Sequence, residues 1–401
     1  MQYCTKCVYP AASAVKLFFD ENGVCSGCSV NAEKSNINWD ERFKMLKEIV
    51  EVYRSKDGSN YDCIIPVSGG KDSHYQTYYM TKKLGLKPLL VTYHGNNYLD
   101  VGEENLKNMR NVFDADHLIF GPSVDVLKKL NRICFKLMGD MNWQNHAGIF
   151  STPVQMAVKF NIPLIIWGEH GRLDLGGQFS LDDLVEMTAK DILEHDKRGY
   201  DWDSMTDVGL KKLGRPELAE GLTAKDLFCF KYPDMEDIAK VGVRGIFLGN
   251  YIEWDANKQT DFIINDFGFK ISPEPFERTY RRMSNLDDMH ENGIHDYLKF
   301  IKWGYGRASD HASKDIRLGI MTREEGIEKV KKHDHIKSKD LYRWLKYVDM
   351  TEEEFDRVCN TFRDPKVWWQ DEDGNWIKDN IWDDVETQKQ KDEQHKASLE
   401  K

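Results

Sequence analysis

The sequence has no long hydrophobic run and no export signal at its start. A transmembrane helix needs about eighteen or more consecutive apolar residues, and no such run occurs although 40% of the 401 residues are hydrophobic. The opening stretch, MQYCTKCVYP, contains neither the basic nor the apolar segment of a signal peptide. We therefore expect a cytoplasmic protein that does not associate with a membrane.

The sequence also has no excess of positive charge. Lysine and arginine number 56 against 67 aspartate and glutamate residues, which gives a formal net charge of -11. Because proteins bind nucleic acids largely through cationic side chains that neutralise phosphates, we expect no nucleic-acid partner. A local basic groove remains compatible with this total.

The pattern of residues divides the chain into three parts. Residues 1–40 hold four of the eight cysteines. Between 41 and 270, strand-length apolar runs alternate with helical patterns, which predicts an α/β fold in which helices cover both faces of a parallel sheet. The charged stretch 175–240 is interpreted as an insertion into this unit. Residues 271–401 are predicted to be mainly helical from about 285 onward, with an irregular polar tail after about 365.

The predicted sheet has five strands, whose carboxyl ends indicate where a ligand binds. The apolar runs lie at 61–67, 87–94, 115–120, 162–170 and 243–250. Parallel sheets of this class bind ligands beyond the carboxyl ends of their strands. The loops that are candidates for functional side chains therefore begin at Ser68, Tyr93, Phe120 and Gly168.

A glycine-rich motif, IIPVSGGKDSHY, follows the first predicted strand. It is not a Walker A loop, because Ile65 occupies the position of the first glycine and Asp72 follows the lysine where Ser or Thr is required. It resembles in full the Ser-Gly-Gly-x-Asp-Ser PP-loop of ATP pyrophosphatases. The residues of the motif are Ser68, Gly69, Gly70, Lys71, Asp72 and Ser73.

The chemistry of this motif suits a phosphate ligand. The glycines let the backbone approach an anion, and their N–H groups form a nest to which the next helix adds its positive end. The two serines add donors, Lys71 adds charge, and Asp72 is interpreted as a magnesium ligand or a structural residue. In the enzymes that the motif resembles, the loop binds the pyrophosphate released when ATP adenylates a substrate oxygen. The alternative is a tight strand-to-helix turn with a purely structural role.

Two C-x2-C pairs near the start predict a metal site. They consist of Cys4, Cys7, Cys25 and Cys28. Four thiolates at this spacing fit a closed, structural zinc site. An iron–sulfur cluster is also compatible with four cysteines, and unligated thiols or a redox pair are the remaining alternatives.

Two further stretches end predicted strands and carry polar side chains. In WGEH (167–170), Glu169 and His170 are candidates to position a nucleophile, hold magnesium or act as a base, and Gly168 is a candidate nucleotide contact. The alternative is a helix cap or a loop salt bridge. Thr92 and His94 are candidates to contact adenosine, with a purely structural role equally open.

The chain resembles the N-acetyl sugar amidotransferase family, which includes PseA and WbpG. The resemblance rests on YCTKCVYP with GVCSGC, on PVSGGKDSHYQ, on IIWGEHG and above all on FIKWGYGRASDHASKDIRLGIMTREEGIEKVKKHD (300–334). It implies a PP-loop fold of the adenine nucleotide alpha hydrolase type. It also implies a role in bacterial surface glycans: pseudaminic or legionaminic acid, flagellin glycosylation, or lipopolysaccharide O-antigen.

The resemblance further implies an ATP-dependent conversion of an acetamido group into an acetamidino group. Adenylating the amide oxygen makes AMP the leaving group, and ammonia then displaces it. The implied cofactors are ATP, Mg²⁺ and structural Zn²⁺, and the substrate is an N-acetylated sugar, free or nucleotide-linked. The first cysteine is Cys4 and no nucleophile elbow is present, so we expect ammonia from solution or from a separate glutaminase subunit.

A cationic face within the 300–334 stretch is the last candidate. The i, i+4, i+7 spacing places three of its members on one side of a helix, and the fourth lies close by: Arg307, His311, Lys314 and Arg317. We expect this face to close over pyrophosphate or an acidic sugar. The alternative is a solvated face with Asp310 and Asp315 as partners.

Two other functions compete with this interpretation. Thiolation of tRNA by a PP-loop enzyme requires reactive cysteines near the nucleotide, whereas Cys63 lies in a predicted strand and Cys134 on a predicted helix, both interpreted as core. The acidic charge also opposes tRNA binding. A non-catalytic ATP-binding partner is the third possibility, and it fits poorly with an intact PP-loop.

Overall fold

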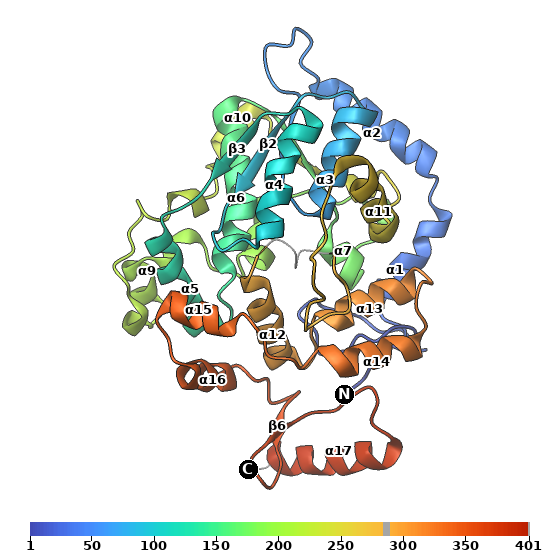
Figure 1. Ribbon diagram of the computed structural model, residues 1–401, viewed down its shortest axis with the longest axis vertical. Coiled ribbons are helices and arrows are strands. Elements are labelled where there is room, and N and C mark those ends of the chain that lie inside the picture. The colour runs from blue at the N-terminus through green and yellow to red at the C-terminus, as the bar shows by residue number, and fades with distance from the viewer. Residues whose placement is uncertain (284–288, 400–401) are drawn as a thin grey trace.

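The computed structural model describes residues 1–283 and 289–399. Within these residues, β1 to β5 form a parallel sheet in the order β3-β2-β1-β4-β5, and helices flank it on both sides (Figure 1). The strands are β1 (Cys63–Pro66), β2 (Pro88–Tyr93), β3 (His117–Phe120), β4 (Leu164–Trp167) and β5 (Arg244–Phe247). The predicted α/β class is confirmed, and each strand is shorter than its apolar run because the run continues into the adjoining loops.

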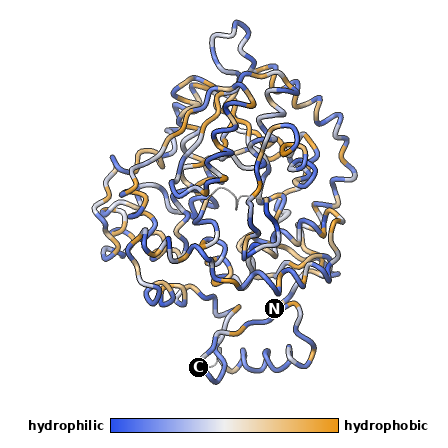
Figure 2. Tube along the Cα trace, in the orientation of Figure 1, coloured by the Kyte–Doolittle hydropathy of each residue, from blue (hydrophilic) through white to orange (hydrophobic). Residues whose placement is uncertain are grey.

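The alternation of side chains along each strand creates a core on both faces of the sheet. Cys63 and Ile65 of β1 pack with α2 (Trp39–Tyr53), α3 (Lys71–Tyr78) and α4 (Asp100–Phe113). Ile64 points to the other face and packs with α6 (Trp143–Phe160). Because both faces are buried, the strands read as continuous apolar runs instead of alternating ones. Figure 2 shows these hydrophobic stretches along the strands.

The strand order places a change of direction between β1 and β4. β1 pairs with β2 on one side and with β4 on the other, so successive crossovers leave the centre of the sheet in opposite directions. A crevice opens at the carboxyl ends of two such central strands, and ligands of doubly wound sheets bind there. The glycine-rich motif after β1 and the WGEH stretch after β4 both lie at this point.

The stretch predicted as an insertion is made of short segments that pack against helices of the α/β unit. Its elements include α8 (Ala189–Asp191), α9 (Asp207–Lys212) and α10 (Met235–Val241), preceded by α7 (Gly171–Gly176). Met205, Leu210 and Phe230 share a buried cluster with residues of α5 (Val124–Met138) and α6. This segment therefore extends the core on the side of α6.

The C-terminal region is helical, as predicted. Its helices are α12 (Glu291–Trp303), α13 (Arg307–Arg317), α14 (Arg323–His333), α15 (Leu341–Val348) and α16 (Glu352–Thr361), and α11 (Ala256–Phe267) precedes them. The predicted start of helical structure near 285 falls partly on 284–288, which lie outside the described residues. Of the helices in the described ranges, none is long and apolar enough to cross a membrane.

The N-terminal unit lies beside the C-terminal helices, which are far from it in sequence (Figure 1). α1 (Ser26–Glu33) belongs to this unit. Val8 packs with Ala312 of α13 and Val330 of α14. Tyr9 meets Tyr305 edge to face, with ring centroids 5.6 Å apart. The first and last parts of the chain therefore form one packed layer.

The prediction of an irregular tail is wrong. β6 (Trp369–Gln370) pairs antiparallel with β7 (Trp376–Ile377), and α17 (Val385–Leu399) follows. Helical periodicity failed to predict α17 because its residues are almost all polar and no apolar stripe marks a face (Figure 2). The tail is held by contacts that the sequence does not reveal: Tyr3 donates a hydrogen bond to the carbonyl of Asp379 at 3.0 Å, and Trp369 stacks on His395.

The packing of α15 gives a first prediction. Trp344 is 2% exposed and packs against Phe135 and Phe355, whereas Tyr342 on the same helix is 74% exposed. Replacing a buried aromatic residue with alanine costs about 3–5 kcal/mol of unfolding free energy. We expect Trp344→Ala to lower stability by that amount in chemical denaturation, while Tyr342→Ala changes it by less than about 0.5 kcal/mol. Equal effects of the two substitutions would contradict this packing.

Candidate active site and metal centre

The glycine-rich motif forms the turn from β1 into α3. Gly69 has a φ of +86°, a conformation that favours glycine. A Cβ on Gly69 would also lie 2.7 Å from the backbone nitrogen of Leu106, so α4 approaches too closely for a side chain. Gly70 is the N-cap of α3 and offers no side chain to cap it. The first N–H groups of α3 are therefore available to an anion at its positive end.

Short hydrogen bonds hold this turn in place. The Gly70 N–H donates to Ser68 Oγ at 3.2 Å, and Ser73 Oγ donates to the Gly70 carbonyl at 2.9 Å. His74 Nδ1 lies 3.1 Å from the same carbonyl. Burial lowers the pKa of His74 to about 4, so this ring is neutral and its Nδ1–H serves as the donor. His74 was not singled out from the sequence, and it supports the loop from the protein side.

A cavity of about 320 Å³ lies at the carboxyl ends of the central strands. Ser68, Asp72 and Ser73 of the motif line it, and so does Gly168 after β4. Tyr93, the last residue of β2, lines it as well. Its position is the switch point of the sheet, where this class of fold binds ligands. The cavity is therefore the candidate active site.

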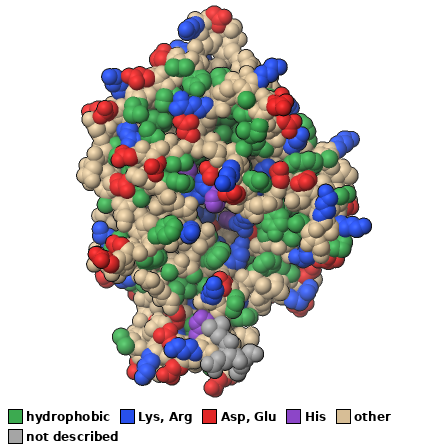
Figure 3. All heavy atoms as spheres, turned by 180° about the vertical axis from the view of Figure 1, so that it is seen from behind, with side chains coloured by type: hydrophobic (Ala, Val, Ile, Leu, Met, Phe, Trp, Pro, Cys, Tyr) green, Lys and Arg blue, Asp and Glu red, His purple; other side chains and the backbone are tan. Residues whose placement is uncertain are grey.

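The opposite wall of this cavity comes from the helical parts of the chain. α6 and the turn before it contribute Asn142, Asn145 and His146, and the C-terminal region contributes Met289, Asn292, His295 and Arg307. On the face drawn in Figure 3, Lys, Arg and His side chains gather in a depression near the middle. The cavity thus has a phosphate-binding side and a side rich in amide, imidazole and guanidinium groups.

A larger hollow of about 570 Å³ lies at the other edge of the sheet. It is lined by residues that precede the strands, among them Tyr61, Lys87 and Asp116. The amino ends of parallel strands are not where ligands of this fold class bind, and none of the predicted site residues lies there. The smaller cavity at the switch point is therefore the functional candidate.

Three of the predicted nucleotide residues serve the loop framework. Lys71 is 7% exposed, and its ammonium contacts both carboxylate oxygens of Asp72 at 2.6 Å. Thr92 donates to the Val67 carbonyl at 2.5 Å and contacts His117, so it links the strands. His94 pairs with Glu103 at 3.0 Å and stacks on Tyr98. Of these three, none lines the cavity in the described structure.

The WGEH stretch separates its two titratable residues. His170 is the N-cap of α7, and its Nδ1 accepts from the Leu173 N–H at 3.3 Å. Burial lowers the pKa of His170 to about 4. Glu169 contacts Lys314 Nζ at 2.9 Å. Burial and the nearby Asp174 carboxylate raise the pKa of Glu169 to about 7. His170 is thus placed as a cap, while Glu169 belongs to an ion pair beside the cavity.

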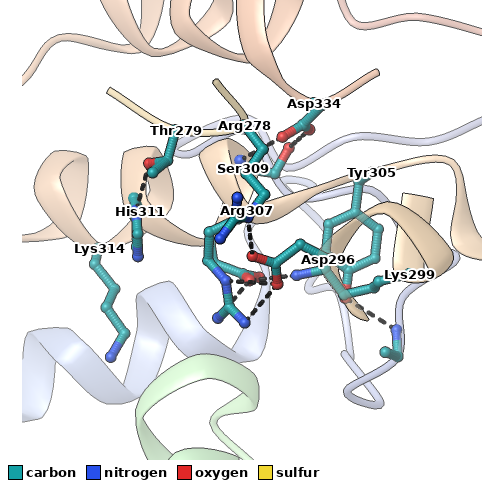
Figure 4. Close-up of polar contacts among 12 residues, drawn as sticks. Arg278, Thr279, Asp296, Lys299, Tyr305, Arg307, Ser309, His311, Lys314 and Asp334 are labelled. Carbon is teal, nitrogen blue, oxygen red and sulfur yellow. Dashed lines mark hydrogen bonds and ion pairs between the residues drawn. The ribbon is translucent and has the colours of Figure 1, made fainter. Parts of the chain in front are cut away.

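The predicted cationic face of α13 is partly buried, and its charged residues are paired. Figure 4 shows Arg307, His311 and Lys314 leaving the helix on the same side. Arg307 contacts Asp296 at 2.7 Å, and Asp296 is only 1% exposed. Burial raises the pKa of Asp296, but Arg307 and Arg278 outweigh it and hold that pKa at about 2. The face therefore packs against other parts of the chain, with Arg307 and Lys314 in ion pairs, and is not a solvated surface.

Only the first member of that face reaches the cavity. Arg307 lines it. Lys314 pairs with Glu169 and Asp174 on the other side of the WGEH loop, and Arg317 donates to the Asp174 carbonyl at 2.7 Å. His311 contacts Thr279 at 2.7 Å, and burial followed by the charge of Arg281 lowers its pKa well below the ordinary value. Lys314 and Arg317 thus support the segment after β4, whereas His311 contacts the segment that precedes α12.

The four cysteines of the N-terminal unit converge on one point. All are buried, and their sulfur atoms lie within 4.8 Å of one another. Cys4 Sγ is 3.9 Å from Cys28 Sγ, and Cys7 Sγ is 3.7 Å from Cys25 Sγ. A tetrahedron of thiolates with Zn–S bonds of about 2.3 Å has edges of about 3.8 Å, whereas a disulfide needs about 2.05 Å. The donor set therefore fits a structural zinc ion.

The cysteine cluster contacts α13 and α14 through two arginines. Arg317 Nη2 lies 3.6 Å from Cys25 Sγ, and its guanidinium lies over the Tyr9 ring. Arg323 donates to the carbonyls of Cys4 and Cys7. Positive groups of this kind stabilise thiolate ligands and orient the loops that bear them. The metal unit and the wall of the cavity are thus connected through α13.

One wall of the cavity comes from a part of the chain that matches a known family. Residues 266–382 match the family described as LPS biosynthesis protein WbpG-like, C-terminal domain. The match confirms the resemblance to this family over these residues. The matched range contains the cavity residues Met289, Asn292, His295 and Arg307.

A curated protein is similar to part of the chain. Uncharacterized protein MJ1599 of Methanocaldococcus jannaschii is 28% identical over 118 residues, which are 29% of this chain and 41% of that protein. The match therefore spans about two fifths of its curated relative. No property of that protein is carried over to this chain.

Two solved structures share parts of the chain's length. An NH3-dependent NAD synthetase from Campylobacter jejuni is 14% identical, with a TM-score of 0.28, and covers 51% of this chain and 92% of its own. An NMN synthetase from Francisella tularensis is 11% identical, with a TM-score of 0.27, and covers 59% and 99%. Scores this low support no argument about fold or activity.

The metal site gives a second prediction. Purified protein contains about one zinc ion per chain, and Cys25→Ser abolishes stoichiometric zinc and lowers the melting temperature, because a structural site contributes directly to folding. Cys359→Ser is the matched control, since Cys359 is buried outside the cluster. Metal analysis that finds neither zinc nor iron in fresh protein would rule out the site.

The turn after β1 gives a third prediction. Gly69→Ala introduces a Cβ against α4 at a positive φ, so we expect pyrophosphate binding to weaken by about tenfold or more, equivalent to about 1.4 kcal/mol, in titration calorimetry. Gly58→Ala is the control, because Gly58 has a φ of +69° but open space around it. Unchanged pyrophosphate affinity in Gly69→Ala would show that this turn does not hold phosphate.

Proposed function

We propose that the protein is an ATP-dependent amidotransferase of bacterial surface-glycan synthesis, which converts the acetamido group of an N-acetylated sugar into an acetamidino group. One observation carries the proposal. The cavity at the switch point is lined on one side by the PP-loop motif and on the other by residues of the WbpG-like C-terminal domain. A phosphate-binding loop and a domain of a lipopolysaccharide-synthesis family thus face each other across a single cavity.

The first half of the reaction uses the phosphate side of the cavity. The amide oxygen attacks the α-phosphorus of ATP, a P–O bond forms, and pyrophosphate leaves. In this proposal the N–H groups at the start of α3 and the hydroxyl of Ser68 bind the leaving pyrophosphate, while Ser73, which lines the same cavity, holds the turn through the Gly70 carbonyl. Arg307 adds positive charge from the opposite wall. Catalysis of this type rests on positioning and electrostatic stabilisation, so no covalent nucleophile is needed.

Asp72 is the residue that fits a magnesium ligand. Its side chain lines the cavity, and although Lys71 contacts both oxygens, each carboxylate oxygen retains a further lone pair. Magnesium in nucleotide sites is held by one or two carboxylates together with substrate phosphates. When bound, the ion would neutralise charge on the phosphates of ATP.

The second half replaces oxygen by nitrogen. The O-adenylated imidate has a good leaving group, AMP, which is released when the C–O bond breaks. Ammonia adds to the imidate carbon, AMP departs, and an amidine remains. No glutaminase motif is present in the sequence, so a separate glutaminase is proposed as the source of ammonia, with ammonium salt as a weaker substitute.

Thiolation of tRNA is less well supported. Cys63 and Cys134 are fully buried, and burial raises the pKa of each thiol well above its ordinary value. Of the described residues, no cysteine lines the cavity. A thiolate nucleophile near the nucleotide, which that chemistry requires, is therefore not provided by this part of the chain.

The nucleotide products give a fourth prediction. With ammonium salt, ATP and a panel of sugars (UDP-N-acetylglucosamine, and pseudaminic and legionaminic acids, each free and nucleotide-linked), an active sugar yields AMP, pyrophosphate and amidine in equal amounts. Asp72→Ala lowers this rate by about a hundredfold or more, whereas Asp373→Ala, at an exposed turn, does not. Glutamine alone supports no turnover. Formation of ADP and phosphate, or of a thiolated product, would contradict the proposal.

A further inference from the structure

A histidine and a buried aspartate form a pair at the wall of the cavity. His295 of α12 lines the cavity, and its Nδ1 lies 2.9 Å from Oδ1 of Asp140. Asp140 is 2% exposed and lies between α5 and α6, 155 positions away in the sequence. The pair therefore joins the WbpG-like C-terminal domain to the α/β unit at the site of chemistry.

The aspartate of this pair is ionised. Burial alone raises the pKa of Asp140, but the positive charges of Arg198 and Lys302 oppose it, and that pKa lies well below its usual range. Arg198 forms an ion pair with Asp140, Lys302 Nζ lies 3.9 Å away, and the Asn142 N–H donates to Oδ1 at 3.0 Å. Four positive or donor groups thus fix a carboxylate charge at one place.

An ionised carboxylate fixes the tautomer of the ring beside it. A carboxylate only accepts hydrogen bonds, so Nδ1 of His295 carries the proton and Nε2 holds the lone pair. Among the residues that the structure describes, Nε2 of His295 has no hydrogen-bond partner. His295 therefore presents a proton acceptor whose orientation is set by Asp140, and its side chain is partly exposed at the cavity.

The surrounding groups do not compete for this role. The ring of His146 on α6 meets His295 edge to face with centroids 5.6 Å apart, and burial lowers the pKa of His146 to about 3. The charged and titratable groups around His295 are Asp140, His146, Arg198 and Lys302, with Asp72 and Arg307 elsewhere on the cavity wall. In this set, His295 is the ring with a fixed acceptor at the cavity.

We propose that His295 is the general base that removes a proton from the attacking nitrogen, and that Asp140 is its positioning residue; this rests on the proposed function. An N–H bond of ammonium breaks and its proton moves to Nε2, while the freed lone pair forms the C–N bond to the imidate carbon. The C–O bond to AMP breaks, and its electron pair leaves with AMP. Asp140 stabilises the imidazolium, which returns its proton to solvent. No oxidant or reductant is required.

The test separates the two halves of the reaction. His295→Gln is compared with His335→Gln, which changes an exposed histidine between α14 and α15, using the sugar from the panel that gives the highest rate of AMP formation. Exchange of labelled pyrophosphate into ATP, without a nitrogen source, measures adenylation. Turnover with ammonium at pH 7 and at pH 9, and with hydroxylamine at pH 7, measures the nitrogen step. Hydroxylamine is uncharged at neutral pH and needs no prior deprotonation.

We expect His295→Gln to keep exchange within about twofold of the wild type and to lose about a hundredfold or more of ammonium turnover at pH 7, the usual contribution of a general base. The loss shrinks at pH 9, where free ammonia is abundant, and is small with hydroxylamine. Asp140→Asn reverses the tautomer of His295, so we expect the same pattern from this variant if it folds. If it does not fold, the result for His295→Gln decides by itself.

The opposite results are equally distinct. Equal losses with ammonium and hydroxylamine, or a pH-independent loss, would show that His295 only shapes the cavity and would overturn the proposal. Loss of pyrophosphate exchange in His295→Gln would assign the residue to adenylation and also overturn it. Absence of exchange in the wild type with every sugar, by contrast, would count against the proposed function itself.

Discussion

The burial of two carboxylates, Asp296 and Asp310, is the constraint on which the arrangement of the C-terminal region depends. A buried charge is tolerated only when opposite charges and hydrogen bonds compensate it. Those of Asp296 come from Arg278 and Arg307, and Asp310 is bonded by Tyr9 of the N-terminal unit at 2.6 Å and paired with Lys299 of α12. Removing one partner would leave an uncompensated charge, so these elements hold one relative position. That position places Arg307 at the cavity (Figure 4).

Two independent features of the fold form the candidate active site. The strand order creates a crevice at the ends of β1 and β4, and the glycines after β1 expose backbone N–H groups there. The buried ion pairs bring α12 and α13 across the crevice. The cysteine cluster lies behind α13 and contacts it through Arg317. A metal bound by that cluster would thus support the cavity wall. The proposed chemistry does not require the metal to take part in the reaction.

The features that were predicted correctly from the sequence are those that local residue patterns specify. Apolar runs specify the strands, and helical spacing correctly put Arg307, His311 and Lys314 on one side of α13. Asp310, which the sequence suggested as a partner, does pair with Arg307 at 3.3 Å. Asp296 and Glu169 were not predictable as partners, because they lie on other elements and nothing local links them to this face. His295 and Asp140 were missed for the same reason, being paired across 155 positions. The helix α17 was missed because its polar sequence has no periodicity, and it is held by the stacking of its His395 on Trp369.

In the proposed reaction, the amide oxygen of the sugar becomes part of AMP. The most direct measurement uses substrate labelled with ¹⁸O in the N-acetyl carbonyl, with mass analysis of the nucleotide and phosphate products. Attack of that oxygen on the α-phosphorus predicts one ¹⁸O atom in the phosphate of AMP for each amidine formed, and none in pyrophosphate. Label in inorganic phosphate or in released water, with unlabelled AMP, would contradict the account.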